Sequence, residues 1–232
     1  MKVESPWTDL LLLGLISGAL VFFWTSPALI PLKILIVLFH ELSHALMTIA
    51  TGGEVVSMTI SADQGGEVLS RGGNRFLTLS AGYLGSLLFG CVLYLLARGS
   101  RRDALWSATL AVILGLTALI FTRNLFGFGF SLGAAIALGA LARWGGASAN
   151  DLVLKTVGLA SMLYVPADIV SDTLTRAHLR SDARMLAEEF GGMTQLWGLL
   201  WLLVAVATIG ITLYLGWRRP AHGALPSAAS GS

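Results

Sequence analysis

The chain has 232 residues, of which 55% are hydrophobic and only 12% are charged, and its mean hydropathy is +0.77. A soluble domain carries about 25% charged residues, so this composition excludes an ordinary soluble protein and indicates an integral membrane protein in a lipid bilayer. The formal net charge of +2 is too small to indicate binding to nucleic acid.

The apolar residues fall into seven runs, each close to the roughly 20 residues that a helix needs to cross a bilayer. The first run follows MKVESPWTDL, which carries one lysine against two acids and precedes no cleavage site, so we expect a retained helix rather than a secretory signal. The expected helices cover residues 9–25, 30–51, 75–98, 104–121, 124–143, 151–170 and 195–217. The predicted fold class is therefore an all-α polytopic membrane protein, a bundle of about six to seven transmembrane helices.

The bundle is expected to form a single domain over residues 1–217. Residues 218–232, RRPAHGALPSAASGS, are small, polar and interrupted by proline, which predicts a disordered tail.

Between the second and third expected helices the spacing of apolar residues changes. In GGEVVSMTISADQGGEVLSRGG, Val56, Met58 and Ile60 are separated by single residues, which is the period of a strand. The segment DQGG then supplies a turn before a second short run. The sequence predicts a β-hairpin over about residues 54–71, directly after the second helix, with a plain connecting loop as the alternative.

Residues 37–47, VLFHELSHALM, place two histidines and a glutamate inside an apolar helix, where polar groups are costly and usually serve a function. His40 and His44 are four residues apart, so both imidazoles lie on one face of a helix and can bind one metal ion. Glu41, next to the first histidine, can hold a water molecule bound to that metal and take its proton. This is the HExxH pattern, and it predicts Zn²⁺ as cofactor, the two histidines as ligands and Glu41 as catalytic base.

A third ligand is expected from a later segment at the same depth. Asp103 and Asp151 fall at the opposite face of the bundle and are interpreted as helix caps. The sixth expected helix ends on the side of the histidines, so Asp168 is the first choice as metal ligand. Asp172, one turn further, is either the alternative ligand or a partner that orients the carboxylate of Asp168. Either aspartate could instead cap a helix end. Asp182, in HLRSDARMLAEEF, is more distant and lies in an amphipathic segment that resembles a solvated surface.

Several segments together resemble the site-2 protease family of intramembrane zinc metalloproteases, in particular its small bacterial branch without a PDZ domain. They are HELSHAL, TGGEV with the hairpin after it, RGGNRFLTLSAGYLGS, LYVPADI, and SDARMLAEEFGG leading to WGLLWLL, which cover most of the chain. The resemblance implies a zinc-bound core with His40 and His44 as ligands and Glu41 as catalytic base. It also implies an aspartate from a later helix as third ligand. In the family this aspartate commonly precedes glycine, whereas Ile169 follows Asp168 here.

The resemblance implies an enzyme, a multi-pass metalloprotease of the bacterial cytoplasmic membrane. Its substrate would be another membrane protein, cleaved in or near a transmembrane segment and held by the hairpin through strand addition. The alternative is an inactive relative that binds membrane proteins as a scaffold or chaperone. Glu41 argues against it, because a pure binding protein gains nothing from that carboxylate. A small-molecule transporter predicts broken helices paired between inverted halves, and the sequence contains no such pairing.

Overall fold

The computed structural model describes residues 6–100 and 102–218, and the predicted tail lies outside this range from residue 219 onward. Its elements are, in chain order, α1 (Pro6–Phe22), the 3-10 turn η1 (Pro27–Leu29), α2 (Ile30–Ala50), β1 (Glu54–Ile60), β2 (Gly66–Arg71), α3 (Arg75–Gly99), α4 (Asp103–Ile120), α5 (Leu125–Trp144), α6 (Gly146–Val170), the π-helical turn η2 (Ser171–Thr175), α7 (Asp182–Phe190) and α8 (Thr194–Arg218).

Six helical segments in the described part of the chain are long and apolar enough to cross a membrane. They are Pro27–Ala50, Arg75–Gly99, Asp103–Ile120, Leu125–Trp144, Gly146–Thr175 and Thr194–Arg218. The first expected helix corresponds to α1, whose apolar part, Leu11–Phe22, is shorter. The prediction of an all-α polytopic bundle is confirmed, and the chain is an integral multi-pass membrane protein.

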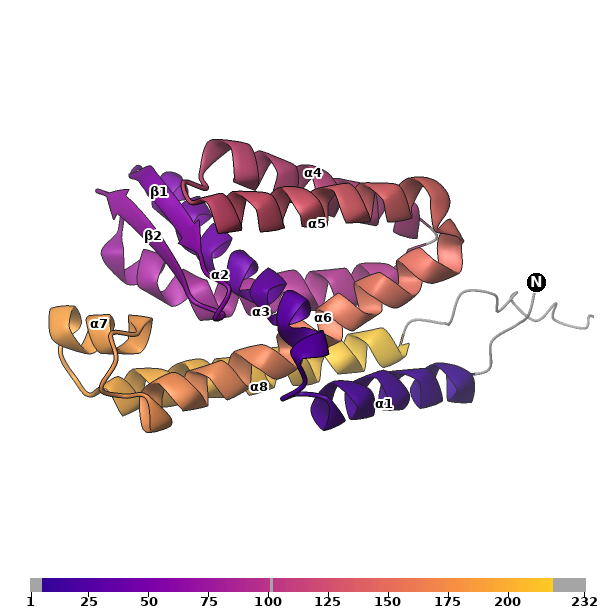
Figure 1. Ribbon diagram of the computed structural model, residues 1–232. Coiled ribbons are helices and arrows are strands. Elements are labelled where there is room, and N and C mark those ends of the chain that lie inside the picture. The colour runs from indigo at the N-terminus through magenta and orange to yellow at the C-terminus, as the bar shows by residue number, and fades with distance from the viewer. Residues whose placement is uncertain (1–5, 101, 219–232) are drawn as a thin grey trace, which may run out of the picture.

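The helices surround two clusters of buried apolar side chains. The first cluster lies among α2, the hairpin, α3, α4, α5 and α6, and the second lies mainly among α3, α6, α7 and α8. α4 and α5 run side by side as an antiparallel pair, and α3 contacts α2, α6 and α8 (Figure 1). The hairpin and α7 lie at the same end of the molecule, and α1 lies toward the other end (Figure 1). Segments far apart in the sequence therefore meet at the end that holds the hairpin.

α3 and α6 approach each other closely because small residues face each other along their contact. A Cβ added at Gly90 would lie 2.6 Å from the Cβ of Ser161, and one added at Gly158 would lie 2.8 Å from the carbonyl oxygen of Gly90. The hydroxyl of Ser161 donates a hydrogen bond of 2.8 Å to the carbonyl of Ser86 across the same contact. Small residues with hydrogen bonds between helices are typical of tight helix packing in membranes.

The predicted hairpin is confirmed, and its strands pair antiparallel from Glu54 opposite Arg71 to Ile60 opposite Gly66. A bulge interrupts the register between Val55 and Ser57.

The other edge of β1 is paired as well, with the loop between α4 and α5. The amide of Met58 donates to the carbonyl of Phe121, and the amide of Arg123 donates to the carbonyl of Met58, both at 2.9 Å. β1 therefore lies between β2 and this loop, and β2 forms the outer edge.

α6 is longer than the sequence predicts. It begins at residue 146 rather than 151. In its first turns the side-chain amide of Asn150 donates hydrogen bonds to the carbonyls of Leu141 and Gly146, which connects the end of α5 to the start of α6. Its last turn widens into η2, after which the chain reverses direction and reaches α7. This reversal brings α7 against α3 and α8.

Replacing Gly158 by alanine tests the contact between α3 and α6. The new Cβ would meet backbone and Tyr94 atoms at 2.8 to 2.9 Å, so the helices must separate, at a cost of about 1–3 kcal/mol. Thermal unfolding in detergent should show a lower midpoint for Gly158→Ala. Gly133→Ala is the matched control, because nothing lies within 4 Å of a Cβ at that position, and it should match or slightly exceed the wild type. A Gly158→Ala protein as stable as this control would contradict the packing described above.

Candidate metal centre

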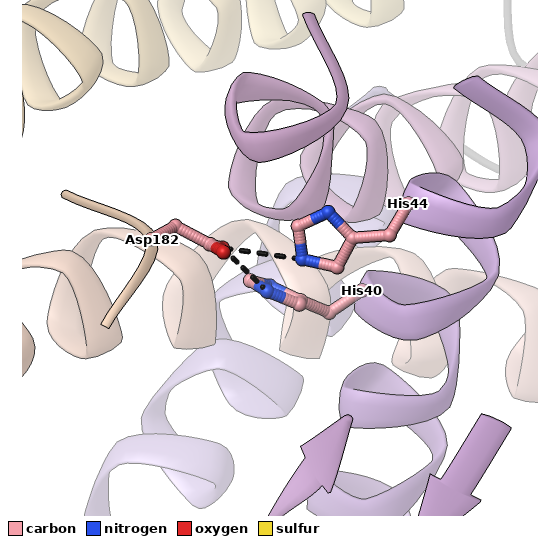
Figure 2. A group of neighbouring side chains, drawn as sticks. All are labelled: His40, His44 and Asp182. Atoms are coloured by element: carbon pink, nitrogen blue, oxygen red, sulfur yellow. Dashed lines mark hydrogen bonds and ion pairs between the residues drawn. The ribbon is translucent and has the colours of Figure 1, made fainter. Parts of the chain in front are cut away.

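Three side chains from two distant segments converge on one point at the hairpin end of the bundle. The Nε2 atoms of His40 and His44, both on α2, lie 3.0 Å and 3.2 Å from the same oxygen, Oδ2 of Asp182 (Figure 2). One ligand atom from each residue lies within 4.8 Å of the other two, and in the described part of the chain this is the group of three or more such side chains that could hold a metal ion. Both histidines therefore share one face of α2, as their spacing predicts.

The backbone of α3 orients the second histidine. Nδ1 of His44 lies 2.7 Å from the carbonyl oxygen of Thr78, so this nitrogen carries the proton and donates it to the carbonyl. The lone pair of Nε2 then faces the carboxylate of Asp182, which is unfavourable unless a cation lies between them or the imidazole is protonated. A histidine fixed in this way by a carbonyl is typical of metal ligands.

The ring of His40 is held by aromatic contacts. Its centroid lies 4.8 Å from that of Tyr83 and 4.7 Å from that of His44, in both cases edge to face. Its freedom to rotate is therefore small.

Gly82, on α3, leaves open the space where the three side chains meet. A Cβ at this position would lie 2.4 Å from Nε2 of His40 and 2.5 Å from Nε2 of His44. Any side chain larger than hydrogen would thus occupy the point where an ion would bind. Two imidazole nitrogens, a carboxylate oxygen and this bare backbone fit a metal with three protein ligands and an open position.

Asp182 reaches the histidines because α7 begins at this residue. The hydroxyl of Ser181 accepts a hydrogen bond from the amide of Arg184 and caps the helix. Further along, Glu189 accepts from Nε of Arg75 at 3.1 Å, which fastens α7 to α3. The carboxylate is thereby presented from a short helix that is not one of the six candidate spans.

The carboxylate of Asp182 is buried, with 8% of its side chain exposed. Burial opposes its ionisation, but the neighbouring imidazoles of His44 and His40 outweigh burial and hold the pKa of this carboxyl below its ordinary value. The group therefore approaches the histidines as an anion.

The structure does not place Asp168, the ligand expected from the sequence, in this cluster. Its Oδ1 accepts a hydrogen bond of 3.1 Å from Arg176, and Asp172 pairs with the same guanidinium at 2.6 Å. Asp172 also accepts from the hydroxyl of Tyr83. The physical reason is that Arg176 pairs with both carboxylates, while the chain reversal after η2 brings Asp182 to the histidines instead. The acid that the structure brings to His40 and His44 is thus Asp182 and not Asp168, which corrects the position expected for it from the sequence.

Glu41 lies beside the cluster and beneath the hairpin. It is only 5% exposed, and a Cβ at Gly66 would lie 2.5 Å from its Oε1. The first residue of β2 is therefore in direct contact with this carboxylate.

The sequence contains a signal for Asp182, although this residue is more distant from the apolar runs than Asp168. A serine cap precedes an amphipathic run, which marks the start of a helix and places the aspartate in its first turn. The same residue lies in SDARMLAEEFGG, one of the segments that carry the family resemblance.

Comparison with known proteins gives one match. A family model described as Peptidase M50B-like matches residues 13–212, a range that contains the cluster, Glu41 and the hairpin. Comparison with curated proteins gave no match, and comparison with solved structures gave none.

Metal analysis of purified protein tests this geometry. Asp182→Asn keeps the size of the side chain and removes its charge, so bound metal should fall from about one ion per chain to well below that. His44→Ala should have the same effect. Asp168→Asn is the matched control and should keep the metal, because its carboxylate is paired with Arg176. Loss of metal in Asp168→Asn together with retention in Asp182→Asn would reverse the assignment.

Proposed function

Since the chain belongs to the peptidase M50B-like family, we propose that it is a zinc-dependent protease that hydrolyses peptide bonds in or near transmembrane segments of other membrane proteins. The family match agrees with the resemblance of its segments to the site-2 proteases. The observation that carries the proposal is the convergence of His40, His44 and Asp182 inside a membrane bundle, with Glu41 beside them.

Zinc is the metal that this donor set favours. Imidazole nitrogen and a carboxylate oxygen suit Zn²⁺ in a site with three protein ligands, and His40, His44 and Asp182 would hold it. When bound, zinc supplies Lewis-acid activation of water and of the scissile carbonyl.

Glu41 is the proton carrier in this proposal. One of its carboxylate oxygens accepts the proton of the attacking water and later delivers it to the nitrogen of the leaving amine. Its contact with Gly66 and its 5% exposure shield it from bulk solvent, so the proton that it takes is retained for the amine. An inactive scaffold would have no use for this buried acid.

The outer edge of β2 is the segment suited to hold the substrate. In an antiparallel pair, residues whose N–H and C=O point away from the partner strand lie opposite each other. The N–H and C=O of Met58 point toward the loop between α4 and α5. Val68 is the partner of Met58 in the register, so the N–H and C=O of Val68 point toward the free edge of β2. An unwound substrate segment can add a strand there, close to Glu41, through main-chain hydrogen bonds.

Replacing the catalytic base separates binding from hydrolysis. Glu41→Gln keeps the shape of the side chain but cannot accept a proton, so cleavage of a membrane substrate in detergent should fall by at least about 100-fold. Its zinc content should equal that of the wild type. A fully active Glu41→Gln protein would rule out this role, and a wild type that carries zinc but cleaves no membrane substrate would favour the scaffold alternative.

Proline at Val68 tests the substrate edge. Proline is tolerated in an edge strand where its nitrogen faces outward, so the hairpin should persist while one donor to the substrate is lost. We expect Val68→Pro to reduce cleavage about 10-fold or more, with zinc content unchanged. Val68→Ala, which keeps the amide, is the control and should stay within a few-fold of the wild type. Equal activity of both variants would mean that the substrate is held elsewhere.

A further inference from the structure

The side chain of Asn124 closes the edge of β1 that faces away from β2. Its Oδ1 accepts a hydrogen bond of 3.2 Å from the amide of Ile60, and its Nδ2 donates one of 2.7 Å to the carbonyl of the same residue. The carboxamide thus pairs with Ile60 as the peptide group of a neighbouring strand would. It extends the backbone pairing that Met58 makes with Phe121 and Arg123.

Asn124 makes these bonds instead of capping its own helix. It is the N-cap residue of α5, a position where asparagine usually bonds to the first turn, yet its side chain makes no capping hydrogen bond. The first turn of α5 leaves room for this arrangement, since a Cβ at Gly127 would lie 2.5 Å from Oδ1 of Asn124 and 3.2 Å from the Cβ of Ile60. The local sequence therefore favours the contact with β1 over the cap.

The contact lies at the level of the proposed catalytic base. Ile60 is the register partner of Gly66, and Gly66 is in contact with Glu41. Ile60 is 1% exposed and Met58 is fully buried, so β1 is held between the first apolar cluster and this loop. A line of contacts runs from Asn124 across both strands to Glu41.

We propose that Asn124 is a positioning residue for cleavage, which sets the depth of the hairpin over Glu41 and leaves β2 as the single edge open to substrate. The proposal rests on the proposed protease function. Asn124 does not contact the metal ligands or Glu41. It acts through Ile60 and Gly66, so its loss should displace the bound substrate relative to Glu41 rather than weaken metal binding.

Two variants test this role with cleavage of a membrane-spanning peptide in detergent. Asn124→Ala removes both hydrogen bonds, and Asn124→Asp replaces the donor with an oxygen that faces the carbonyl of Ile60. In both, kcat per bound zinc should fall by about 10- to 100-fold, with a smaller change in KM because the edge of β2 remains. Mass spectrometry of the products should show cleavage at additional neighbouring bonds, which a general loss of stability would not produce. Asn74→Asp is the matched control, since its Oδ1 caps α3, an acceptor role that a carboxylate retains, and it should behave as the wild type.

A single cleavage site at wild-type kcat in both variants would overturn the proposal.

Hydrogen exchange provides a test that does not depend on the proposed protease function. In Asn124→Ala the amide of Ile60 should exchange faster than in the wild type, while the amide of Thr59, whose register partner is Glu67 on β2, should not. If the wild type cleaves no substrate, the protease assignment fails. Faster exchange at Ile60 would then still support the role of Asn124 in holding β1 in place. Unchanged exchange at Ile60 would overturn it.

Discussion

The approach of one buried carboxylate to two imidazoles is the interaction on which the rest of the site depends. In an apolar bundle a polar group without a partner is costly, and the carboxylate of Asp182, 3.0 and 3.2 Å from Nε2 of His40 and His44, is the partner of these imidazoles once they are protonated or hold a cation. This requirement connects α2 to α7, two elements that are not neighbours in the sequence. The reversal of the chain after η2 and the cap at Ser181 both serve to bring that carboxylate into place.

α3 packs against both histidines and orients their side chains. Its carbonyl at Thr78 accepts the proton of His44, its bare backbone at Gly82 leaves space between the two histidines, and Tyr83 packs on His40. α3 in turn packs closely against α6 at Gly158. The orientation of the histidines thus depends on a backbone carbonyl, a glycine and a tyrosine that form no recognisable motif in the sequence.

Much of this organisation could be predicted from the sequence, because hydrophobic runs, strand alternation and the spacing of two histidines are local patterns. The helices, the hairpin and the convergence of His40 with His44 follow from them. The position of the acid that joins the two histidines does not, because it depends on how the chain turns after α6. The expectation that it lies within an apolar run favoured Asp168, whereas Arg176 pairs with that residue and Asp182 enters from an amphipathic helix.

The covering of β1 was equally out of reach of sequence reasoning. Asn124 lies 64 residues after Ile60, and its sequence context indicates only a helix cap. A free edge on β1 and a free edge on β2 are equivalent in the sequence. Only the packing of the α4–α5 loop distinguishes them.

The position of the acid of this cluster, Asp182, on α7 also has a consequence for the biosynthesis of the chain. Asp182 follows His40 by 142 residues, so during synthesis both histidines enter the membrane well before the acid exists. The two imidazoles alone make an incomplete and weaker metal site. The proposed metal site therefore cannot be complete until α7 has emerged and packed against α3, so that metal loading and the proposed activity would come late in the maturation of the protein.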